Sequence, residues 1–171
     1  AAERRRQLEN DLRVAIREEQ FVLYFQPIVD LLEQRVAGAE VLIRWNHPQR
    51  GLVSPNEFIP LAEDTGLIVD IGLWTLEASG RQLAQWRAEG RELSLSLNVS
   101  GRQIPAGLPV EVLRDALCRL GFTPAFLALE ITEGVLLDDV EGALNWLTAV
   151  RSQGFSIYLD DFGTGYSSLS Y

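Results

Sequence analysis

Residues 155–169 read FSIYLDDFGTGYSSL, and this stretch decides how the rest of the chain is interpreted. The apolar run 155–159 predicts a buried strand, and the glycines that follow predict a loop. Asp160 and Asp161 stand where the strand gives way to the loop. Two adjacent carboxylates repel each other, and a loop offers them no buried partner. The pair therefore indicates a cation bound at this end of the strand.

The same pattern, an oxygen-bearing side chain at the end of an apolar strand, recurs three times upstream. Glu130 follows the run 126–129, Asn98 follows the run 93–97, and Glu40 lies in the apolar segment 39–45. Carboxylate and amide oxygens form a hard ligand shell that suits Mg²⁺ or Mn²⁺ and also accepts Ca²⁺. The sequence thus predicts that separate strands direct oxygen ligands to one place.

Composition limits the class of protein. The 171 residues, 47% of them hydrophobic, suffice for one core, and no stretch reaches the ~18 apolar residues of a membrane span. We therefore expect an α/β unit in the cytoplasm that makes no membrane contact itself. Membrane anchoring of the parent protein through another segment stays open. The net charge of −9 argues against DNA binding, because phosphate backbones attract clustered cations.

The chain has too few cysteines and histidines for a disulfide or for a zinc site built from them. The single Cys118 excludes an internal disulfide, and with the single His47 it excludes a zinc site of several soft or imidazole ligands. Cys118 is expected to be buried on a helix, and His47 to lie in a turn. Neither residue is assigned a catalytic role.

Hydrophobic periodicity predicts alternating strands and helices. Ser54 followed by Pro55 predicts a helix start, and the helical pattern continues to Gly90. Predicted strands cover 21–29, 35–43, 93–99, 126–131 and 155–160, and further predicted helices cover 5–19, 109–120 and 138–153. The alternation with mostly apolar strands favours a parallel sheet covered by helices.

Together these segments resemble the EAL family of cyclic di-GMP phosphodiesterases. The family's tripeptide reads Glu40-Val41-Leu42 here, and the DDFGTGYSSL string carries most of the resemblance. Further support comes from the segments 25–28, 58–63 and 98–103. The resemblance implies a TIM-type (β/α) barrel of which only about five strands are present, whereas a closed barrel requires about eight. Residues 1–20 would form a linker helix, and 21–171 the N-terminal portion of an EAL domain.

The resemblance also implies roles for individual residues. A catalytic set would comprise Glu40, Asp160, Asp161 and Glu133, with Glu133 steadying the glycine loop. Two Mg²⁺ or Mn²⁺ ions would be held by Glu40, Asn98, Glu130, Asp160 and Asp161, and Ca²⁺ is expected to inhibit. The cyclic di-GMP groove would be lined by Gln26, Leu42, Arg44, Pro60 and Glu63, with Arg44 directed at a phosphate.

The chain departs from the family pattern in two ways. Val41 replaces the alanine of the family's tripeptide, which adds volume beside Glu40. The family also uses a lysine on the next strand and a glutamate and a glutamine nearer the C-terminus, whereas all 15 basic residues here are arginine. The chain is therefore expected to stop before the barrel closes and to be inactive alone.

Three functional interpretations stay open. The complete domain would hydrolyse cyclic di-GMP to linear pGpG in bacterial second-messenger signalling. Alternatively, it would be a non-catalytic cyclic di-GMP receptor, or an interaction module that associates through its open sheet edge, for example as a homodimer. In each case the linker helix would lead in from an upstream signalling domain, either diguanylate-cyclase-like or sensory.

Overall fold

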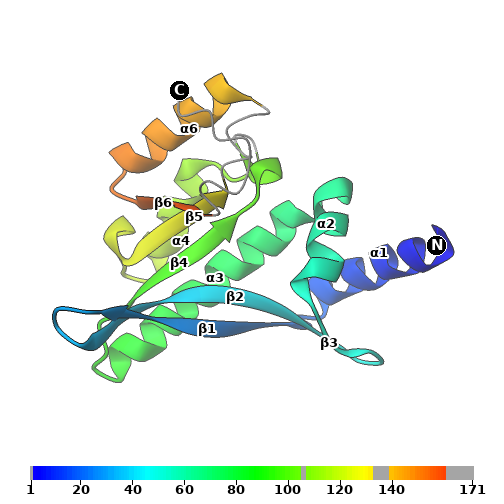
Figure 1. Ribbon diagram of the computed structural model, residues 1–171, viewed down its shortest axis with the longest axis horizontal. Helices are drawn as coiled ribbons and strands as arrows, with labels where there is room; N and C mark the ends of the chain where they lie inside the picture. The colour runs from blue at the N-terminus through cyan, green and yellow to red at the C-terminus, as the bar shows by residue number, and fades with distance from the viewer. Residues whose placement is uncertain (1, 105–106, 133–138, 161–171) are drawn as a thin grey trace.

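The computed structural model describes residues 2–104, 107–132 and 139–160 (Figure 1). One mixed sheet runs through this part of the chain in the order β1-β2-β4-β5-β6, and a short β3 pairs with β2. The strands are β1 (Phe21–Asp30), β2 (Arg35–His47), β3 (Gly51–Val53), β4 (Ser94–Val99), β5 (Leu127–Thr132) and β6 (Ser156–Asp160).

The sheet has a parallel part and an antiparallel edge. β2, β4, β5 and β6 pair in parallel, while β1 and β3 pair antiparallel to β2. The predicted α/β class and the partial TIM-type barrel are confirmed by this architecture and by the structural relatives described below. The antiparallel direction of β1 and the strand β3 were not anticipated, because apolar periodicity alone does not give strand direction.

Helices alternate with the parallel strands. They are α1 (Ala2–Arg17), α2 (Pro55–Thr65), α3 (Ile68–Ala88), α4 (Val110–Arg119) and α6 (Val140–Ser152), with 3₁₀ turns η1 (Gly101–Gln103) and η2 (Pro124–Phe126). As predicted, Ser54 caps α2: its side chain accepts a hydrogen bond from the backbone N–H of Asn56. Gly66 ends α2 at a φ of +78°, a left-handed conformation that favours glycine.

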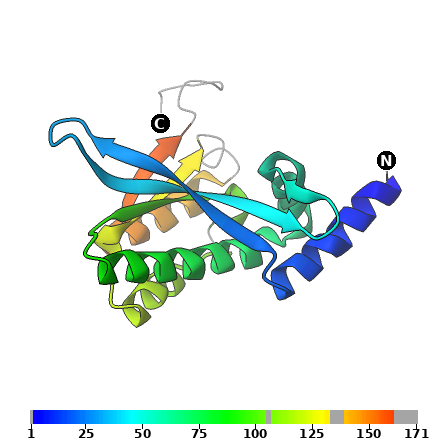
Figure 2. The ribbon, with the colours of Figure 1, turned by 90° about the horizontal axis from the view of Figure 1, so that it is seen from below.

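One apolar core fixes the position of the parallel strands. α3, α4 and α6 lie on one side of the sheet, and Figure 2 shows α3 and α4 together there. Leu129 of β5, Leu113 of α4 and Val150 of α6 are completely buried. Full burial of such a side chain contributes about 1.5–3 kcal/mol to folding. The strands are therefore held from their apolar face, and the opposite face is left for polar side chains.

A second core joins α1 to the rest of the molecule. Leu12 and Ala15 of α1 are completely buried against the end of β2, α2 and the start of α3. The ring of Phe21 lies within 6.3 Å of the rings of Trp45, Phe58 and Trp74. The predicted N-terminal helix is thus present and packs on the domain, while the boundary at residue 20 stays a prediction.

Two further expectations concern burial and membranes. The prediction that Cys118 is buried is wrong, since the buried face of α4 carries Val110, Leu113, Ala116 and Leu117, and Cys118 is exposed beside it. In residues 2–104, 107–132 and 139–160, no helix is both long and apolar enough to cross a bilayer. The cytoplasmic location stays a prediction.

Candidate metal centre

Strand register brings the predicted ligands to one face of the sheet. Glu40 on β2 is in register with Ser96 on β4, and Asn98 is in register with Glu130 on β5. Asp160 ends β6 in register with Thr132, two residues after Glu130. Because paired residues share a face and side chains alternate along a strand, all these side chains lie opposite the helix-covered face.

The structure corrects the position of Glu40 within its strand. Sequence analysis placed Glu40 at a strand end, but β2 continues to His47. The parallel ladder between β2 and β4 nevertheless ends at Val41 and Leu97. Glu40 therefore lies near the end of the ladder, where β2 parts from β4, and this is the position that the ligand argument required.

Strand β4 and the residue after it donate hydrogen bonds to three glutamates from three different elements. The Ser96 hydroxyl donates to Glu130 Oε1 at 2.5 Å, and the Asn98 amide donates to Glu40 Oε1 at 2.8 Å. The Ser100 hydroxyl donates to Glu63 Oε1 of α2 at 2.6 Å. The donors stand at alternate positions, so carboxylates from β5, β2 and α2 gather on one face of β4.

Sequence analysis assigned no role to Ser96 or Ser100. The sequence feature that points to them is the alternation of small polar and apolar residues in SLSLNVS, residues 94–100. This pattern marks one polar face of a strand. Their partners depend on register and helix placement, which the sequence pattern does not give.

Electrostatics distinguish Glu130 from an ordinary surface carboxylate. Burial raises the pKa of Glu130, and the nearby carboxylates of Glu40 and Asp160 raise it further, while the hydrogen bond from Ser96 opposes the change. Desolvation and like charges both disfavour the ionised form. A cation at this place would remove both penalties, because it supplies the positive charge that these carboxylates need.

A pocket opens beside the carboxylates where β2 parts from β4. Its volume is about 320 Å³, and most of its lining side chains are apolar. Leu42, Arg44 and Glu63 line it together with Asn98 and Glu130. A largely apolar pocket with a few polar groups is typical of a small-molecule site.

Arg44 is oriented by two neighbours. Its Nη1 donates to the carbonyl oxygen of Ile43 at 2.8 Å, and its guanidinium lies over the ring of Tyr24, 5.5 Å from the centroid. A cation over an aromatic face is attracted by the ring's electron density. Tyr24, which sequence analysis did not single out, thereby keeps the charge of Arg44 on the face that carries Glu40.

The structure gives fewer contacts for the other predicted site residues. Gln26 of β1 is exposed and in register with Glu40, so it shares the carboxylate face. Pro60 is exposed on α2 and borders a second pocket against α1, away from the pocket that Glu63 lines. Glu133 and Asp161 lie outside the described residues. The assignment of all these side chains to substrate or metal stays a prediction.

The described donors fit a hard divalent cation in kind but do not form a closed ligand shell. Glu40, Asn98 and Glu130 supply oxygens on adjacent strands, and the Asn98 amide contacts Glu40 through its nitrogen, which leaves its oxygen able to accept. Among residues 2–104, 107–132 and 139–160, no three histidine, cysteine or acidic side chains are close enough to hold a metal. The metal centre is therefore argued below as a proposal.

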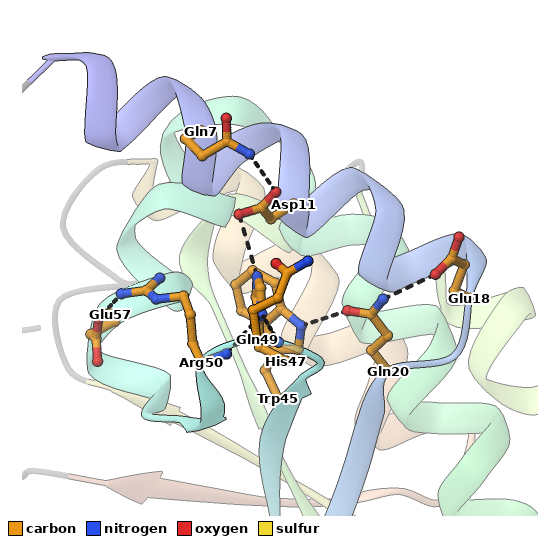
Figure 3. A network of polar contacts seen from close by, with 9 residues as sticks. All are labelled: Gln7, Asp11, Glu18, Gln20, Trp45, His47, Gln49, Arg50 and Glu57. Carbon is orange, nitrogen blue, oxygen red and sulfur yellow. Dashed lines mark hydrogen bonds and ion pairs between the residues drawn. The ribbon is translucent and has the colours of Figure 1, made fainter.

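A different polar cluster surrounds His47 (Figure 3). His47 is buried as the last residue of β2, and the turn begins at the next residue. The prediction that His47 lies in the turn is therefore wrong. Its Nδ1 accepts the backbone N–H groups of Gln49 and Arg50, and its Nε2 lies 3.3 Å from Asp11 Oδ2 of α1. Figure 3 also shows Trp45 donating to Gln20 at 3.1 Å. These contacts tie α1 to the end of β2.

Known proteins resemble this chain along its whole length. The family model described as "EAL domain" matches residues 9–171. MucR of Pseudomonas aeruginosa, a bifunctional diguanylate cyclase/cyclic di-GMP phosphodiesterase, is 42% identical over 171 residues, which are 99% of this chain and 25% of MucR. The cyclic di-GMP phosphodiesterase PdeR of Escherichia coli is 39% identical over 163 residues, 95% of this chain and 24% of PdeR.

A solved structure shares the fold. The PaMucR phosphodiesterase in complex with c-di-GMP superposes with a TM-score of 0.87 at 44% identity, covering 95% of this chain and 66% of that chain. The chain thus spans about a quarter of the length of the curated relatives that it matches.

Proposed function

Since the chain belongs to the EAL domain family, we propose that its complete domain hydrolyses cyclic di-GMP to linear pGpG. Water adds to one phosphorus, one ester bond to a ribose 3′-oxygen breaks, and that oxygen takes up a proton. The observation that carries the proposal is the row of Glu40, Asn98 and Glu130 on adjacent strands beside the pocket that Arg44 lines. Named relatives with this activity and a cyclic di-GMP complex of one of them support it.

The proposed cofactors are two Mg²⁺ or Mn²⁺ ions, with Ca²⁺ as an inhibitor. Bound there, they would lower the pKa of a water and neutralise charge on the phosphodiester. Glu40, Asn98, Glu130 and Asp160 would hold them, together with Asp161. The raised pKa of Glu130 supports this role, because burial and the nearby carboxylates both disfavour its negative charge and a bound cation would offset both.

On the substrate side, Arg44 would bind a phosphate and Leu42 would pack against a base. The contact between the Arg44 guanidinium and the Tyr24 ring limits the positions that the charge can adopt, so less entropy is lost on binding. Glu63, held by Ser100, lies on the α2 side of the pocket and would accept hydrogen bonds from the ligand. Gln26 and Pro60 are proposed as further contacts.

The relatives' names suggest the setting of the domain. MucR is described as bifunctional, and this chain covers a quarter of it, so relatives contain further domains. We propose that α1 leads in from such a signalling domain, because it packs on α2 and β2 through Leu12, Ala15 and the contact between Asp11 and His47. A homodimer of the parent protein is a further proposal.

The test uses the full-length protein with cyclic di-GMP as substrate. We expect pGpG to form with Mg²⁺ or Mn²⁺, to stop when EDTA is added, and to fall by at least about 10²-fold in Glu40→Ala. The matched control is Glu57→Ala on α2, a solvent-exposed glutamate paired with Arg50 outside the pocket, which should leave turnover unchanged.

Each alternative result has a distinct meaning. Unchanged turnover in a folded Glu40→Ala protein would contradict the metal assignment. Tight binding of cyclic di-GMP without product, at saturating Mn²⁺ and after long incubation, would instead establish a receptor.

A further inference from the structure

Ser96 is a buried hydroxyl in the middle of the polar face, and the proposed activity leaves it without a role. Only 1% of its surface is exposed, although serine is usually a surface residue. Its side chain lies between two predicted ligands, since Ser96 is in register with Glu40 and donates to Glu130 Oε1. A buried hydroxyl requires a hydrogen-bond partner, and here the partner is a carboxylate.

The contact is suited to orienting Glu130. A hydrogen bond to a carboxylate is stronger than one between neutral groups, and Ser96 donates such a bond to Glu130 Oε1. Ser96 is held in a strand paired on both sides, so its hydroxyl is a fixed point. With Oε1 accepting from Ser96, Oε2 would be the oxygen of Glu130 available to a cation on the polar face.

β2 and β4 are in close contact at the start of their ladder, two residues before Ser96. A Cβ at Gly38 on β2 would lie 2.6 Å from Ser94 Oγ and 2.5 Å from the Ser94 carbonyl oxygen. Serine at position 96 is small and still donates a hydrogen bond.

We propose that Ser96 is a positioning residue of the metal centre, which holds the Glu130 carboxylate in the orientation that binds a divalent cation. The inference rests on the proposed function, since it assumes that Glu130 is a metal ligand. Residues that orient a metal ligand through a hydrogen bond typically contribute 10- to 100-fold to metal affinity or activity. Ser96 acts through Glu130 and touches neither metal nor substrate.

The test measures Mn²⁺ binding to the substrate-free, full-length protein by the paramagnetic resonance signal of free Mn²⁺. We expect Ser96→Ala to weaken Mn²⁺ binding about 10- to 100-fold. The matched control is Ser94→Ala: Ser94 is on the same strand and face, but its hydroxyl donates to the Ala37 carbonyl oxygen at 3.4 Å. That variant should change affinity less than about twofold, because no carboxylate depends on it.

Ser96→Thr separates the hydroxyl from packing. Threonine keeps the donor and adds a methyl group, so it should recover most of the affinity lost in Ser96→Ala if the hydrogen bond is responsible. Wild-type affinity in folded Ser96→Ala, or equal losses in the Ala and Thr variants, would overturn the role of Ser96 while leaving the metal centre intact. Absence of Mn²⁺ binding in the wild-type protein would overturn the proposed function as well.

Discussion

His47 on β2 and Glu130 on β5 are both titratable side chains of the sheet, the first buried and the second partly buried, yet their surroundings are opposite. The ring of His47 has partners at both nitrogens, two backbone N–H groups and the carboxylate of Asp11. Glu130 accepts a hydrogen bond from the Ser96 hydroxyl, and its pKa is raised by burial and further by two nearby carboxylates. A structural polar cluster pairs donors with acceptors, whereas a cation site gathers acceptors.

The difference separates polar residues whose contacts are completed within the protein from the carboxylates that we propose as ligands. The contacts of His47 are complete within the protein and join α1 to β2, so they stabilise the fold. The carboxylates on the open face crowd one another and are better satisfied by an added cation.

Glu130→Gln should separate activity from stability most strongly. The amide keeps the shape but loses the charge that a divalent cation requires, so cyclic di-GMP turnover should fall about 10²- to 10³-fold. Turnover of the full-length protein at saturating Mn²⁺, with circular dichroism to confirm folding, measures this loss. Turnover within about twofold of wild type would remove Glu130 from the site.

His47→Ala should instead lower stability and leave turnover unchanged. It removes the partner of the Gln49 and Arg50 N–H groups and of Asp11 Oδ2, which should lower the free energy of unfolding by about 1–3 kcal/mol. Turnover per folded molecule should be unchanged, because His47 lies outside the pocket lining. Urea unfolding and active-site titration check both parts, and a specific loss of turnover at full stability would refute the structural role.

Gly72→Ala probes the link between packing and the pocket. A Cβ at Gly72 would lie 1.9 Å from Nε2 of buried Gln103, whose Oε1 accepts the backbone N–H of Ser100. Displacing Gln103 should cost about 1–3 kcal/mol of stability and, by freeing Ser100 from its position beside Glu63, weaken cyclic di-GMP binding.

Gly80→Ala is the matched control for that variant. Its Cβ would lie 2.2 Å from Leu120 Cδ1, the end of an apolar side chain outside the pocket lining. Leu120 can turn this end away from the new methyl group, so stability should change little and the dissociation constant for cyclic di-GMP, measured by calorimetry, should stay the same. Equal weakening of binding in both variants would show that the pocket responds to general packing.

The smallest effect is the pH dependence of the metal-free protein. The folded pKa of Glu130 is raised above its ordinary 4.5, so its protonated form is favoured by folding. The stability that this group contributes is complete below pH ~4.5 and is lost as the pH rises through the folded pKa.

Glu130→Gln removes the loss of stability that ionisation of Glu130 causes in the metal-free protein. In EDTA at neutral pH the variant should therefore be slightly more stable than wild type, by less than about 1 kcal/mol, because solvent screens a half-exposed group. The difference should vanish near pH 4, as chemical denaturation at several pH values would show. A variant that is less stable at every pH would contradict the raised pKa.

Much of this arrangement could be predicted from the sequence, for identifiable reasons. The alternation of apolar strands with capped helices indicated the α/β class, and Ser54 with Pro55 marked the start of α2. Glu40, Asn98 and Glu130 are predictable because each was expected at the end of an apolar strand, and the register brings them to one face.

What the sequence could not give depends on contacts between distant segments. The direction of β1, the burial of His47 against Asp11, and the carboxylate partners of Ser96 and Ser100 all require the tertiary arrangement. Cys118 was misplaced by a single position on α4, because a helical stripe inferred from periodicity has uncertain edges.

The central claim is that the open-face carboxylates form a cation site and the His47 cluster does not. The most direct test is the rise in unfolding free energy that Mn²⁺ causes in the substrate-free protein. A ligand at 100 times its dissociation constant stabilises the folded state by about 2.7 kcal/mol. We predict this gain for wild type and for His47→Ala, and its loss in Glu130→Gln. A gain of the same size in Glu130→Gln, or none in wild type, would contradict the assignment of the metal centre.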